Sequence, residues 1–90
     1  EPVDANALVE SAMRLMRAAA NHAEVRCRLE LDAHLPLVAV DKLQIEQVLV
    51  NLMANAIDSL ATRPEGERQL RVSVRKRGAS RVAVCVADNG

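Results

Sequence analysis

The sequence predicts an α+β domain in which two helices form one layer and a β-sheet forms the other. Residues 4–21 and 41–61 place apolar side chains at helical spacing. Residues 25–32, 69–77 and 81–88 have instead the composition and the period of two that are typical of strands. The 90 residues suffice for one small domain, and no repeat or interior linker divides them.

The first predicted helix begins after Asp4, whose side chain can cap it, and ends near Asn21. Its apolar side is formed by Leu8, Ala12, Leu15 and Ala19, flanked by Val9, Met13 and Met16. The strand that follows alternates Val25, Cys27, Leu29 and Leu31 with Arg26, Arg28, Glu30 and Asp32. This alternation predicts a strand with one covered and one open face.

The second predicted helix begins at Asp41, which together with Gln44 forms a start similar to a capping box. After it, the Pro and Gly of TRPEGE predict a loop. The last two strands are joined through residues 78–80, GAS, which favours an antiparallel hairpin.

The composition limits the function. Phe, Tyr and Trp are absent, so the core must be aliphatic, and there is no ring on which nucleic-acid bases could stack. Twelve basic residues balance twelve acidic ones, which predicts neither nucleic-acid binding nor direct membrane contact. No apolar run approaches the roughly 18 residues of a membrane span. Six basic residues crowd one segment, and alternation predicts that most form a solvated face: Arg68, Arg71, Arg75, Lys76, Arg77 and Arg81.

The two cysteines, Cys27 and Cys85, lie in apolar, strand-like surroundings and form no CxxC pair. We expect two buried, reduced thiols in a cytoplasmic protein.

The second helix has an unusual polar side. On a helical wheel, Ile45, Leu49, Leu52, Met53, Ala56 and Leu60 gather on one side, and Gln44, Gln47, Asn51, Asn55, Asp58 and Thr62 line the other. Asn is a poor helix former, so this side is either an ordinary exposed stripe or a site. Asn51 and Asn55 are four residues apart on one face, and their neutral amide oxygens could coordinate a hard cation or position a phosphate.

These residues carry a resemblance. QIEQVLVNLMANAIDSL, residues 44–60, resembles the N box of the ATP-binding domain of sensor histidine kinases, relatives of gyrase, chaperone and mismatch-repair ATPases. VADNG, residues 86–90, resembles the opening of that family's D-x-G-x-G motif, with Asp88 and Gly90 in register. The resemblance implies a Bergerat-type fold, a two-layer α/β sandwich with two helices on a mixed sheet. Residues 1–90 would be its truncated N-terminal part, ending inside the D-x-G-x-G motif.

The resemblance also implies roles for individual residues, with ATP and Mg²⁺ as cofactors. Asn55 matches the asparagine that binds the Mg²⁺ bridging the nucleotide phosphates. Asn51 stands where hydrolysing relatives keep a water-activating glutamate, and a neutral amide there fits phosphoryl transfer better than hydrolysis. Asp88 matches a buried carboxylate that accepts the adenine amino group, and Gly90 would let the backbone approach the base. Without the resemblance, a turn explains Asp88 equally well.

The sequence departs from the family pattern in two places. Asp58 stands three residues after Asn55, where many kinases have a Lys or Arg that holds phosphate, so its role is left open. His22 and His34 lack the H-E/D-x-x-P setting of the family's phosphoacceptor and are expected at a helix end or in a loop. We therefore expect no catalytic residue within this chain and an inactive fragment.

The implied function is part of the catalytic domain of a bacterial two-component sensor histidine kinase. Its partners would be ATP, a histidine-bearing dimerisation domain of the same protein, and a response regulator. The location would be cytoplasmic, either in a free protein or in the cytoplasmic portion of a membrane-anchored sensor. Two alternatives stay open: a noncatalytic interaction module of the same fold, and an ATP-hydrolysing member of the superfamily. The open edge of strand 81–88 also predicts self-association of the fragment.

Overall fold

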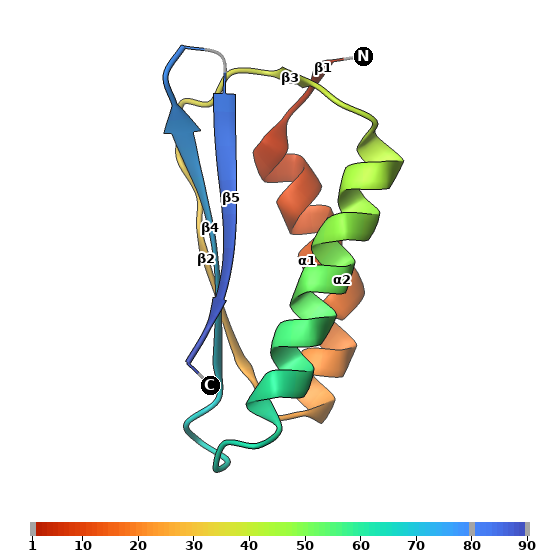
Figure 1. Cartoon of the computed structure of the whole chain (residues 1–90), viewed down its shortest axis with the longest axis vertical. Coiled ribbons are helices and arrows are strands. Elements are labelled where there is room, and N and C mark those ends of the chain that lie inside the picture. The colour runs from red at the N-terminus through yellow and green to blue at the C-terminus, as the bar shows by residue number, and fades with distance from the viewer. Residues whose placement is uncertain (1, 80, 90) are drawn as a thin grey trace.

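The computed structural model describes residues 2–79 and 81–89 and confirms the two-layer arrangement, with a pair of helices covering one face of a sheet (Figure 1). In chain order the elements are β1 (Pro2–Val3), α1 (Ala5–His22), β2 (Arg26–Glu30), β3 (Val38–Ala39), α2 (Lys42–Leu60), β4 (Gln69–Arg77) and β5 (Arg81–Asp88).

The main sheet has three strands in the order β2-β4-β5 and is mixed, as predicted. Strand β2 runs parallel to β4, so α2 is part of the connection between two neighbouring parallel strands. Strands β4 and β5 form the predicted antiparallel hairpin. A short ribbon, in which β1 pairs antiparallel with β3, joins the chain before α1 to the chain before α2. Within the described residues, neither helix is long and apolar enough to cross a membrane.

Both helices begin with the predicted caps. An oxygen of the Asp4 carboxylate accepts the Asn6 amide N–H at 2.9 Å, and one of Asp41 accepts that of Gln44 at 3.1 Å. Each bond satisfies a backbone donor that has no partner inside the helix. The helices end at His22 and Leu60, within one residue of the expected positions.

The core lies between the helices and the sheet and is aliphatic. Its largest fully buried side chains are Val9, Met13, Met53, Leu60, Leu70, Val72 and Val74. Three residues predicted for the apolar sides of the helices are instead exposed: Leu15 by 61%, Leu52 by 46%, and Ala19. Each helix packs against both the sheet and the other helix, so its buried stripe is turned away from these three positions.

Most of the basic segment is exposed, as predicted, and Arg68 is the exception. Its guanidinium donates to the carbonyl oxygens of Ala23 at 2.7 Å, Arg63 at 2.9 Å and Ala61 at 3.2 Å. Ala23 follows α1 and Ala61 follows α2. The half-buried Arg68 side chain therefore ties both helix ends to the start of β4.

The prediction of buried cysteines was wrong, although both thiols are free. Cys27 lies on the edge strand β2, and Cys85 lies on the face of β5 that no helix covers. Partial burial of the Cys27 thiol raises its pKa, and the nearby charge of Arg17 acts in the opposite direction.

Candidate functional site

The polar side of α2 is exposed, as predicted: Gln44, Gln47, Asn51, Asn55 and Asp58 all face solvent. One flank of the helix faces α1, because the Ser11 hydroxyl donates to the Glu46 carboxylate at 2.6 Å. The opposite flank carries Val48 and Leu52 and faces β5. Since Val48, Leu52 and Asn55 are spaced i, i+4 and i+7, Asn55 continues the flank that faces β5.

An apolar groove of about 320 Å³ lies along this flank, with walls formed by α1, α2, β3 and β5. Ile45, Val48 and Leu52 line it from α2, and Val82 and Val84 line it from β5. The groove explains why Leu52 remains exposed, since the space beside it is not filled by the described residues. An apolar wall continued by amide side chains suits a ligand with an apolar part and a polar part.

The asparagine pair supplies neutral oxygen ligands. Asn51 accepts a long hydrogen bond from the Gln47 side chain at 3.5 Å, which constrains it weakly. Asn55 is exposed one turn further along the helix. Among the described residues, no group of three His, Cys, Asp or Glu side chains could hold a metal ion. An exposed amide oxygen fits Mg²⁺, which commonly takes one or two protein oxygens and completes its shell with water and phosphate.

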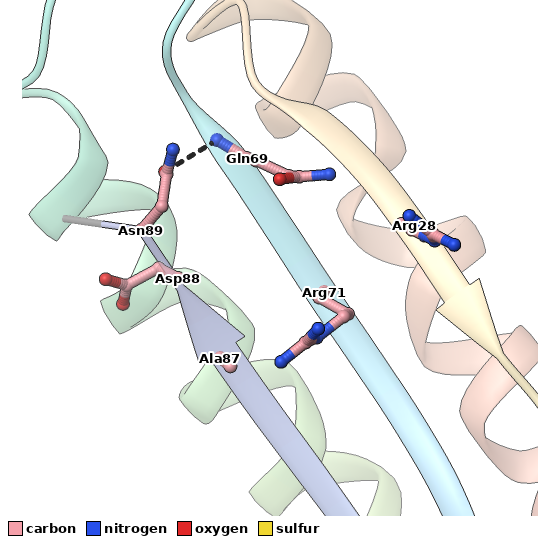
Figure 2. Close-up of a pocket in the computed structure, with 6 residues that line it drawn as sticks. All are labelled: Arg28, Gln69, Arg71, Ala87, Asp88 and Asn89. Atoms are coloured by element: carbon pink, nitrogen blue, oxygen red, sulfur yellow. Dashed lines mark hydrogen bonds between the residues drawn. The ribbon is translucent and has the colours of Figure 1, made fainter.

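Asp88 ends β5 and pairs in register with the buried Leu70. This register places Asp88 on the sheet face that carries the helices, and β5 contacts α2 directly. Figure 2 shows its carboxylate at the end of the strand, directed away from the Arg71 side chain. The resemblance implies a buried carboxylate at this position, but Asp88 is exposed because it is the last residue of an edge strand.

Asn89 is a positioning residue that the sequence did not reveal. Its side-chain oxygen accepts the Gln69 backbone N–H at 2.9 Å (Figure 2), and its amide donates to the Glu67 carbonyl at 2.6 Å. These bonds fix the end of β5 against the start of β4 and so set the position of Asp88. The sequence Asp-Asn-Gly indicated only a turn, because the partners of Asn89 are distant in the chain.

The structure thus brings three of the four predicted site residues, Asn51, Asn55 and Asp88, to the neighbouring elements α2 and β5. The fourth, Gly90, lies outside the described residues. His22 occupies the last turn of α1 and His34 a loop, as expected. Asp58 is exposed near the end of α2.

Comparison with models of known protein families found no match. Individual relatives are similar over almost the whole chain. The sensor protein FixL of Bradyrhizobium diazoefficiens is 37% identical over 92% of this chain, and the histidine-protein kinase AtoS of Escherichia coli is 31% identical over all of it. The chain belongs to the sensor histidine kinase family. It spans 16% of FixL and 14% of AtoS, so it corresponds to a small part of each kinase.

Solved structures agree on the fold of this histidine kinase segment. The catalytic domain of the histidine kinase ThkA superposes on all of the chain with a TM-score of 0.86 and 23% identity, and 58% of that domain is covered. The histidine kinase AdeS of Acinetobacter baumannii gives a TM-score of 0.67 over 87% of the chain at 28% identity, with 36% of AdeS covered. The predicted fold class is therefore confirmed.

Proposed function

We propose that residues 1–90 form part of the ATP-binding catalytic domain of a bacterial two-component sensor histidine kinase. The kinase would bind Mg-ATP and pass the γ-phosphoryl group to a histidine on a separate dimerisation domain. One observation carries the proposal: Asn51 and Asn55 lie exposed on α2, next to the strand that ends in Asp88, in a chain homologous to FixL and AtoS.

Each residue has a distinct role in this proposal. The Asn55 amide oxygen is the protein ligand to Mg²⁺, which neutralises phosphate charge when bound. Asn51 is neutral and cannot take a proton from water, so transfer to a protein histidine is favoured over hydrolysis. Asp88 accepts a hydrogen bond from the adenine amino group, and Asn89 holds Asp88 in place through β4. Gly90 would allow the backbone to come close to the base.

The partners follow from the same proposal. ThkA, which shares this fold, has been solved in complex with the response regulator TrrA. This complex supports a response regulator as the partner of the kinase proposed here, besides the dimerisation domain. A solved relative in fold, QseC, is described as a cytoplasmic segment, which supports a cytoplasmic location.

Radiolabel transfer from γ-labelled ATP in the longer kinase polypeptide tests the proposal. Asn55→Ala should abolish Mg²⁺-dependent autophosphorylation and leave the fold intact, because Asn55 is exposed and Ala favours helix. Asn21→Ala is the matched control, since Asn21 is an exposed asparagine in the last turn of α1, outside the proposed site. Near-normal labelling of Asn55→Ala would remove Asn55 from the metal site.

A further inference from the structure

The sheet face opposite the helices, here called the outer face, is strongly basic. Leu70, Val72 and Val74 point from β4 into the core, so the alternate residues of β4 and their partners on β2 and β5 point outward. Six arginines occupy these outward positions, and all are exposed: Arg26, Arg28, Arg71, Arg75, Arg77 and Arg81. Figure 1 shows both helices on the other side of the sheet.

The outer face concentrates charge that the whole chain does not have. The formal net charge of the 90 residues is zero, whereas Glu30 is the one carboxylate at an outward position of β2, β4 and β5, and Asp32, just beyond β2, is a second one close to Arg75. The register also places Arg28 directly opposite Arg71, and Arg77 directly opposite Arg81. Like charges directly opposite each other destabilise a sheet, so this pattern costs the isolated domain stability.

The contacts of Glu30 show that the arginines of the outer face attract a carboxylate. Its carboxylate is 3.4 Å from the Arg28 guanidinium, 3.9 Å from that of Arg71 and 3.8 Å from that of Arg75. Ideal charge-assisted hydrogen bonds measure about 2.7–2.9 Å, so one carboxylate shared by three arginines does not satisfy their donors. The three arginine side chains remain 65%, 56% and 62% exposed.

The residues around the arginines indicate which class of partner fits the outer face: a polypeptide, a nucleic acid or a membrane. Beside them, β5 presents the small outward residues Ala83, Cys85 and Ala87, so another polypeptide can lie close to the sheet. The chain has no aromatic residue on which nucleic-acid bases could stack. Among the described residues, the exposed large hydrophobic side chains all lie away from the outward positions. The outer face therefore has the charge but not the apolar side chains that binding to a membrane surface requires. Guanidinium groups bind carboxylates with two parallel hydrogen bonds, which favours an acidic protein.

We propose that the outer face is a docking surface for an acidic segment of another protein or domain, whose Asp and Glu side chains bridge the arginines. Arg28 and Arg71 also line a shallow cavity of about 210 Å³, whose other lining residues are Gln69, Ala87, Asp88 and Asn89 (Figure 2). The outer face lies opposite the helix that carries Asn51 and Asn55, but this cavity reaches Asp88, so a partner bound in it would lie next to one residue of the proposed nucleotide site.

Fluorescence anisotropy with a labelled peptide of alternating glutamate and serine tests the proposal at physiological ionic strength. The 90-residue chain should bind the peptide, and Arg71→Gln/Arg75→Gln should weaken binding by about tenfold, since it removes two exposed guanidinium–carboxylate pairs. Arg14→Gln/Arg17→Gln changes the net charge equally on exposed α1 positions and should weaken binding much less. Circular dichroism checks that both variants are folded.

Three results would overturn the proposal. The first is a peptide that does not bind, and the second is equal weakening in the two double variants, which would indicate attraction to net charge alone. The third is tighter binding of a single- or double-stranded DNA oligonucleotide, or of phosphatidylserine vesicles, than of the acidic peptide. That result would assign the outer face to nucleic acid or to lipid.

Discussion

Arg68→Ala should destabilise the domain by about 3 kcal/mol. The side chain makes three hydrogen bonds to carbonyl oxygens, and the two partly buried ones, to Ala23 and Arg63, decide the magnitude. A hydrogen bond to a charged group contributes about 1.5–3 kcal/mol when well formed, and water can reach the freed carbonyls at this surface, so we take the lower value for each. The bond to Ala61 is longer and exposed and adds little.

Urea denaturation followed by far-ultraviolet circular dichroism measures this loss, because the chain has no Trp or Tyr for intrinsic fluorescence. With a slope of about 1 kcal/mol per molar urea for a small domain, the midpoint should fall by about 3 M. The urea midpoint of Arg68→Lys should lie between those of the parent and of Arg68→Ala, since an ammonium group cannot reproduce the planar fork of a guanidinium. Arg77→Ala, an exposed position on β4, is the control. If Arg68→Ala and Arg77→Ala differ by less than about 0.5 kcal/mol, Arg68 does not hold the helix ends.

Two further predictions concern Asp32 and Asn51. Hydrogen bonds from the backbone N–H groups of Lys76 and His34 lower the pKa of Asp32 below its ordinary value of 3.8. The stabilisation by Asp32 is therefore complete above pH 3.8 and is lost as the pH falls through the lower folded-state pKa. Asp32→Asn should be less stable than the parent near neutral pH. The difference in stability, measured by urea denaturation at a series of pH values, should shrink as the pH falls into the acid range. A difference that does not change with pH would contradict the stabilising role of the Asp32 carboxylate. Asn51→Glu in the longer kinase should lose transfer to histidine, measured with γ-labelled ATP, because a base then occupies the position. Unchanged autophosphorylation would show that Asn51 does not stand at the base position.

The elements whose signals are local were predictable from the sequence. The caps at Asp4 and Asp41 depend on residues two or three positions apart, and the β4–β5 hairpin depends on a short loop. The ribbon of β1 and β3 was missed, because two-residue strands are too short to show a period. Arg68 and Asn89 were missed for another reason, since their partners Ala23 and Glu67 become neighbours only after the sheet has formed.

The exposure of the amide-rich helix side in the candidate site was predictable, and its surroundings were less so. The amide-rich side of α2 is exposed as the wheel predicts. Periodicity alone could not predict that Leu52 would line a groove, because the wheel separates apolar from polar residues but does not say which apolar residues find a partner. Nor could it predict the exposure of Asp88, which depends on the position of β5 at the sheet edge.

The parallel pairing of β2 with β4 has a consequence for folding. The pairing closes only after the chain has passed through α2, so it is a contact of high sequence separation, which slows folding. It also means that α2 is tethered at both ends, since the chain before it is held by the β1–β3 ribbon and the chain after it by β4 of the main sheet. Amide hydrogens in the middle of α2, around Asn51 and Asn55, should therefore exchange with solvent only through unfolding of the whole domain. The helix proposed to hold the metal is thus a rigid platform, and any mobility needed for nucleotide exchange must come from other segments.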